Sequence, residues 1–173
     1  MSDMQAVVSA IRAQFPDAVK DVIEFRGETT VVIDREALVE AATFCRDADG
    51  LAFNFLTDIC GVDYWPQEPR FAVNYQLYSM MLGHTLRLKI YVPGDDAVAP
   101  TITGVYPPAG WLEREVWDLL GVAFEGHPDL RRILLPHDWT GHPLRKDYPL
   151  GYEEVQFSFN VDDVMAHKPH PKE

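Results

Sequence analysis

Hydrophobic residues recur at helical spacing at the start of the chain. The apolar positions fall three or four residues apart, at Met4, Val7, Val8, Ile11 and Phe15, which places them on one face of a helix. Ser2 and Gln5 match the capping-box pattern, and Pro16 cannot continue a helix. The pattern predicts an amphipathic helix over residues 2–15.

A hairpin and a second helix are expected next. The stretch "DVIEFRGETTVVID" holds two β-rich runs on either side of Gly27, which is typical of a hairpin. Asp34 is a candidate N-cap for the following helix, and Gly50 closes the connection after it. The buried stripe of this helix should consist of Leu38, Ala41, Ala42 and Cys45.

Three strands follow, centred on "LAFNFLTDICGVD", "FAVNYQLYSM" and "TLRLKIYV". In the last of these, apolar residues alternate with Arg87, Lys89 and Tyr91, as they do in a sheet with one wet face. Helices and hairpins occur without strict strand–helix alternation. The fold class is therefore expected to be α+β, with helices packed on a mostly antiparallel sheet.

A third helix and a long irregular extension complete the chain. The stretch "YPPAGWLEREVWDLLG" predicts a short helix that ends at Gly121, with an inner stripe of Leu112, Val116, Leu119 and Leu120. Residues 122–150 then combine four prolines with many apolar side chains. We expect an α+β domain over 1–121 and a partner-wrapping segment with a tail over 122–173, in one structural domain overall. Alternating residues 155–161 suggest an edge strand or a strand added to another chain.

Composition narrows the classes of function. The formal net charge is −12, which opposes binding to nucleic-acid phosphates. No apolar run is long enough to span a bilayer, and the first residues lack the pattern of a secretory leader, so we expect a cytoplasmic location. Cys45 and Cys60 are expected to be buried reduced thiols, with a disulfide as the alternative.

Two catalytic interpretations have little support in the spacing. His127, His137 and His142 invite a metal site but lack a nearby fourth ligand. Glu113, Glu115 and Asp118 could act with His127 in acid–base catalysis, but they do not share one helical face, and Arg114 is expected to form a surface ion pair with Asp118. The chain has no glycine-rich phosphate loop and too few cysteines for an iron–sulfur cluster.

A protein–protein interface explains the composition of the segment after position 110 better than a catalytic or metal site does. Arginines, carboxylates and tryptophans gather there among fixed proline turns, and buried charges need partners. A solvated face of an isolated domain is the alternative.

The stretches "EREVWDLLGVAFEGHPDLRRIL" and "DWTGHPLRKDYPL" resemble the C subunit of bacterial NADH-quinone oxidoreductase, respiratory complex I. The strong part covers residues 111–150. The matching motif positions are Glu113, Arg114, Glu115, Asp118, Leu119, Leu120, His127, Arg131, Ile133 and Leu134.

The resemblance implies a peripheral protein on the cytoplasmic side of the cell inner membrane, docked against the D, B and I subunits of the complex. It implies no cofactor in this chain, with FMN, iron–sulfur clusters, NADH and quinone bound by other subunits. In "GHPLRKDYPL", Arg145, Lys146 and Asp147 would find charge partners across a subunit boundary. The expected partner interface comprises Glu113, Arg114, Glu115, Asp118, His127, Arg131, Arg132, Asp138, Trp139, Arg145, Lys146, Asp147 and Tyr148.

Two other functions stay open. An equivalent subunit of a membrane-bound hydrogenase or a ferredoxin-linked complex would have a similar sequence. A free-standing acid–base or metal enzyme would use Glu113, Asp118 and His127.

Overall fold

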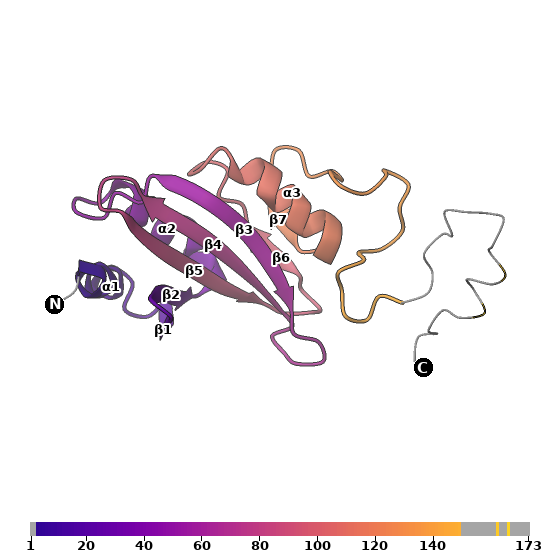
Figure 1. Cartoon of the computed structure of the whole chain (residues 1–173), viewed down its shortest axis with the longest axis horizontal. Coiled ribbons are helices and arrows are strands. Elements are labelled where there is room, and N and C mark those ends of the chain that lie inside the picture. Colours follow the sequence, from indigo (N-terminus) through magenta and orange to yellow (C-terminus); the bar gives the residue numbers. More distant parts are fainter. Residues whose placement is uncertain (1–2, 150–161, 163–165, 167–173) are drawn as a thin grey trace.

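The computed structural model describes residues 3–149, 162 and 166 (Figure 1). The helices are α1 (Asp3–Gln14), α2 (Leu38–Asp47), which follows the 3-10 turn η1 (Arg35–Ala37), and α3 (Ala109–Leu120). The strands are β1 (Val19–Phe25), β2 (Glu28–Ile33), β3 (Phe55–Asp63), β4 (Phe71–Ser79), β5 (His84–Val92), β6 (Val98–Pro100) and β7 (Ala123–Glu125). The α+β class and the order of the predicted elements are confirmed. No helix among the described residues is long and apolar enough to cross a membrane.

The main sheet is mixed, with the order β1-β2-β5-β4-β3. Its pairs are antiparallel except β2 with β5, which run parallel. The β1–β2 turn passes through Arg26 (φ 52°) and Gly27 (φ 82°). Two consecutive positive φ values define the tight hairpin turn whose twist matches that of the strands, so the hairpin predicted around Gly27 is confirmed.

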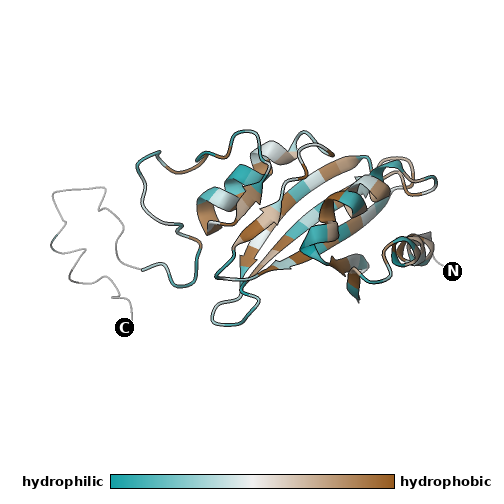
Figure 2. Cartoon of the chain, turned by 180° about the vertical axis from the view of Figure 1, so that it is seen from behind, coloured by the Kyte–Doolittle hydropathy of each residue, from teal (hydrophilic) through white to brown (hydrophobic). Residues whose placement is uncertain are grey.

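One face of the sheet carries the core. Along β5, Leu86, Leu88, Ile90 and Val92 are buried while the residues between them are less so, and Figure 2 shows the alternation along the long strands. Helices α1, α2 and α3 contribute to the same apolar cluster. The predicted α2 stripe of Leu38, Ala41, Ala42 and Cys45 is fully buried.

Helix α3 packs on β3 and differs from its predicted inner stripe. Val116 and Leu120 are buried, as expected, and Gly121 adopts a left-handed φ of 75° after the helix. The space between α3 and the sheet is closed at Gly61, where an added Cβ would overlap Leu120. Glu113 and Asp118 are also fully buried, which the apolar pattern did not indicate.

Several local predictions are corrected by the structure. The loop expected before α3 contains β6, which pairs in parallel with β7, so regular structure extends past position 121. Asp34 precedes η1 but makes no capping hydrogen bond, because its carboxylate pairs with Lys20 at 2.8 Å. Cys45 is buried, whereas Cys60 is exposed. The strand suggested over 155–161 lies outside the described residues.

Candidate functional site

Asp118 anchors the chain that follows β7. Its Oδ2 accepts backbone N–H bonds from Ile133, Leu134 and Leu135 at 3.0, 2.8 and 2.9 Å, and its Oδ1 accepts from Arg132 Nη1 at 2.6 Å. Burial alone would raise the pKa of Asp118, but these donors lower it to about 2. The carboxylate is therefore a charged anchor for residues 126–149, called here the C-terminal segment.

Two arginines tie the C-terminal segment to α3. Arg132 Nη2 also donates to the carbonyls of Trp139 and Gly141, at 2.8 and 3.0 Å. Arg114 on α3 donates to the carbonyls of Arg131 and Arg132, both at 3.0 Å. The predicted surface ion pair between Arg114 and Asp118 is wrong, because Asp118 faces inward and pairs with Arg132.

The same segment also donates hydrogen bonds to the last backbone carbonyls of α3. The backbone N–H of Leu144 donates to Leu119 O at 3.0 Å. Arg145 Nε donates to Leu120 O at 2.6 Å, and its Nη2 adds a longer contact to Gly121 O at 3.3 Å. Since a helix leaves its last carbonyls without partners, the C-terminal segment caps α3 from outside.

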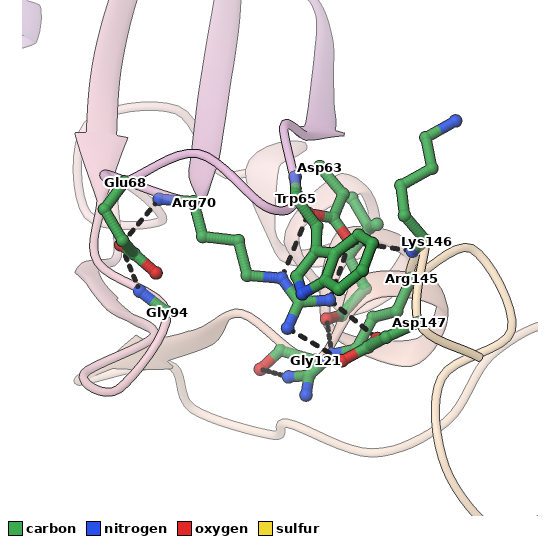
Figure 3. Close-up of polar contacts among 10 residues, drawn as sticks. Asp63, Trp65, Glu68, Arg70, Gly94, Gly121, Arg145, Lys146 and Asp147 are labelled. Carbon is green, nitrogen blue, oxygen red and sulfur yellow. Dashed lines mark hydrogen bonds and ion pairs between the residues drawn. The ribbon is translucent and has the colours of Figure 1, made fainter. Parts of the chain in front are cut away.

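A second anchor holds the far end of the C-terminal segment (Figure 3). Arg70, at the start of the β4 region, donates to both oxygens of Asp63 at 3.0 and 2.8 Å and to both oxygens of Asp147 at 2.9 and 2.7 Å. Asp63 also accepts from the backbone of Trp65 and Lys146. Burial would raise the pKa of Asp63, but Arg70 and these backbone donors lower it to about 2.

The location of these charge partners corrects one sequence-based expectation. Asp147 pairs with Arg70, and Arg145 binds the end of α3, so both find partners within the chain. The Lys146 backbone binds Asp63, while its exposed side chain has no partner in the described part of the chain. The assignment of these residues to a partner interface stays a prediction.

A buried polar cluster surrounds Glu113. Its carboxylate accepts from Thr101 Oγ1 at 2.5 Å and from Ile102 N–H at 2.8 Å, and His127 Nε2 lies 3.9 Å away. Burial raises the pKa of Glu113, although the two donors oppose the shift. The Tyr75 hydroxyl, whose pKa burial and Glu113 both raise, has no hydrogen-bond partner in the described structure. The cluster joins the loop after β6 to α3 and to the C-terminal segment.

Apart from Glu113 and His127, which lie 3.9 Å apart, the residues considered for catalysis are dispersed. His127 Nε2 lies 3.0 Å from Gly110 O, His142 Nδ1 lies 2.9 Å from Asp118 O, and His137 is exposed. Glu115 faces solvent on α3. Within residues 3–149, 162 and 166, no group of three or more histidine, cysteine or acidic side chains is arranged to hold a metal ion.

The remaining predicted interface residues lie along the C-terminal segment. Asp138 is exposed, and Arg131 is an exposed residue that pairs with Asp129 at 2.9 Å. Trp139 is half-buried, and Tyr148 contacts Thr140 O at 3.5 Å. The segment that carries them contacts α3 through Asp118 and the end of β3 through Asp63.

The sequence pattern did not identify Asp63 and Arg70. They flank "YWPQEP", whose composition predicts only a polar, proline-rich link. An acid that closes an apolar strand and a base that opens the next one could have suggested an ion pair across the hairpin, but their joint contact with Asp147 depends on the tertiary fold.

Comparison with known proteins identifies the family. Residues 31–154 match the family described as "Respiratory-chain NADH dehydrogenase, 30 Kd subunit". The chain belongs to this family. The match extends over α2, α3, both anchors and the C-terminal segment, so the features described above lie inside the family region.

Relatives of the 30 kDa subunit support the same assignment. The C subunit of NADH-quinone oxidoreductase from Roseiflexus sp. (strain RS-1) is 48% identical, and the aligned region covers 99% of this chain and 98% of the relative. That of Geobacter metallireducens is 50% identical over 87% of this chain and 92% of the relative. The resemblance to the C subunit of complex I is therefore confirmed.

Solved structures share the fold. A trypsin-resistant fragment (1–134) of Nqo5 matches with a TM-score of 0.63 and 36% identity, covering 74% of this chain and 99% of that chain. A chain of the archaeal membrane-bound sulfane sulfur reductase matches with a TM-score of 0.75 and 22% identity, covering 99% of this chain and 97% of its own length. The second likeness shows a common fold alone.

Proposed function

We propose that this chain is a structural component of the peripheral arm of proton-translocating NADH-quinone oxidoreductase, docked against the D subunit and its neighbours, the B and I subunits. The observation that carries the proposal is the C-terminal segment, which has no regular secondary structure yet is fixed at both ends by Asp118 and Arg70. A preassembled surface loses less conformational entropy when it binds.

Exposed side chains along this surface suit a permanent interface. Trp111 is 63% exposed, Leu134 59% and Leu144 56%, and the exposed Lys146 side chain, with no described partner, follows Leu144 closely in sequence. Apolar anchors with a charged rim are typical of protein–protein contacts. The internal ion pairs fix the conformation of the C-terminal segment and leave these exposed side chains free to contact a partner.

The chain would contribute position and rigidity to electron transfer from NADH to quinone. FMN, the iron–sulfur clusters, NADH and quinone would be bound by other subunits, and this chain would have no active site of its own. Reactive groups need supports that hold them to within a fraction of an ångström. The proposed location is the cytoplasmic side of the inner membrane.

Substitution of Lys146 by glutamate tests the docking role without disturbing the internal contacts, because Lys146 uses only its backbone N–H within the described chain. We expect K146E to leave the unfolding temperature of the isolated chain unchanged and to reduce the amount of this chain recovered with the purified complex. Arg12→Glu makes the same charge change on α1, where the exposed guanidinium has no described partner, and serves as the control.

The docking proposal fails if K146E and a second substitution, Leu134→Asp, both leave complex assembly at the level of the Arg12→Glu control. Blue-native gels and quantitative mass spectrometry of solubilised membranes would measure the incorporated chain.

A further inference from the structure

The outer edge of strand β3 has no strand hydrogen-bonded to it in the described residues. In the described part of the chain β3 pairs with β4 alone, at the end of the sheet beside α3 (Figure 1). An edge strand presents unpaired N–H and C=O groups, and proteins commonly protect such edges with charges. The opposite edge strand, β1, exposes Lys20, Asp21 and Glu24, and these charges oppose strand addition.

The exposed residues of β3 are uncharged. They are Phe55, Thr57, Cys60 and Val62, and Phe55 is 49% exposed. This nine-residue strand, whose register is irregular between Leu56 and Asp58, therefore has no charged residue among its exposed ones, and its acid Asp58 is half-buried.

An apolar hollow lies beside this edge. It has a volume of about 140 Å³ and is lined by Ile59 and Gly61 of β3, by Val116, Leu119 and Leu120 of α3, and by Leu144 of the C-terminal segment. Leu144 is held by its backbone bond to Leu119, while its side chain stays 56% exposed. The hollow could therefore accommodate an apolar side chain of another polypeptide.

The charges around the hollow have one sign. Asp58 and Glu115 line it, and no lysine, arginine or histidine of the described chain does. Neither carboxylate has a hydrogen-bond or ion-pair partner in the described structure. A segment that entered the hollow would be complementary if it placed a lysine or arginine next to its apolar residue.

We propose that an extended segment of a neighbouring subunit adds a strand to the free edge of β3, inserts an apolar side chain beneath α3 and pairs a basic residue with Asp58 and Glu115. Main-chain bonds to β3 would provide affinity and the hollow would provide specificity, as in other cases of strand addition. The inference rests on the proposed role of the chain as a docked subunit and specifies one of its contact sites.

Hydrogen exchange by mass spectrometry tests the added strand in the complete complex and in the isolated full-length chain. Alternate amides of β3 face away from β4, so these amides should exchange rapidly in the isolated chain. In the complex their exchange should slow by on the order of tenfold or more. The amides of β1 provide the matched control, because that edge is expected to stay free.

Unchanged exchange in β3 of a chain that is incorporated in the complex would overturn this inference and leave the docking role intact. Failure of the chain to copurify with the complex would overturn both. Protection already complete in the isolated chain would show that the edge is occupied without a partner, and would also overturn the inference.

Substitutions in the hollow give a second readout. Leu144→Asp should reduce incorporation into the complex and β3 protection, because it replaces an apolar wall of the hollow by a charged group that the inserted apolar side chain would desolvate. Leu144→Met should retain both. Equal incorporation and equal β3 protection for the two variants would contradict the proposed contact.

Discussion

Arg70 and Asp147 lie 77 positions apart in sequence and form a two-point ion pair, with Nη1–Oδ2 and Nη2–Oδ1 distances of 2.9 and 2.7 Å. The same guanidinium pairs with Asp63, whose side chain is 1% exposed. The chain between Arg70 and Asp147 includes β4, β5 and α3, so the contact closes the C-terminal segment onto the sheet.

The two ion pairs of Arg70, with Asp63 and with Asp147, should contribute differently to the free energy of unfolding. Arg70→Met leaves the buried Asp63 carboxylate without its cation, and we expect a loss of about 3–5 kcal/mol in the free energy of unfolding. Asp147→Asn removes an acid that is 44% exposed, and should cost about 0.5–1 kcal/mol. Urea denaturation of the isolated chain measures both, and equal losses would contradict the proposed asymmetry.

Asp118→Asn should release the first part of the C-terminal segment. The amide keeps one acceptor oxygen but loses the negative charge that binds Arg132 and three backbone N–H groups. We expect faster trypsin cleavage after Arg131 and Arg132, and a stability loss of about 3 kcal/mol. Glu115→Gln, on the solvent side of the same helix, is the control and should leave cleavage unchanged.

Acid should weaken both anchors in a defined range of pH. Asp63 and Asp118 have pKa values of about 2 in the folded chain, below the value of about 3.9 for an unfolded aspartate. Their stabilising contribution is fully present above about pH 4 and is lost as the pH falls through about 2. Thermal unfolding followed between these values should show a steeper loss for the wild-type chain than for Asp118→Asn, and parallel curves would count against this origin.

Glu113 should have the opposite pH dependence. Its pKa is raised by burial, so its contribution to stability is greatest below the pKa of an unfolded glutamate and declines as the pH rises through the folded value. Glu113→Gln should remove this decline while Ile102 N–H retains an acceptor. The free energies of unfolding of the wild-type chain and of Glu113→Gln should diverge as the pH rises above the pKa of an unfolded glutamate. Identical slopes against pH would show that ionisation of Glu113 does not cause the decline.

The sequence predicted the elements better than it predicted the contacts of the charged residues. Period-two and helical apolar patterns located the strands and helices because burial on one face determines them directly. Glu113 and Asp118 do not fit this rule, since they are buried to bind backbone groups brought in from the loop after β6 and from the C-terminal segment. Such long-range pairing has no local periodicity, which is why Asp63 and Arg70 were missed and the partner of Asp147 was misplaced.

In the isolated chain the C-terminal segment is already bound to α3, before any partner arrives. Residue-resolved hydrogen exchange of the isolated chain tests it at the amides of Ile133, Leu134 and Leu135, all of which donate to Asp118. We expect these three amides to be protected at neutral pH and to lose that protection together in Asp118→Asn. Exchange of all three at the rate of an unstructured peptide in the wild-type chain would contradict the account.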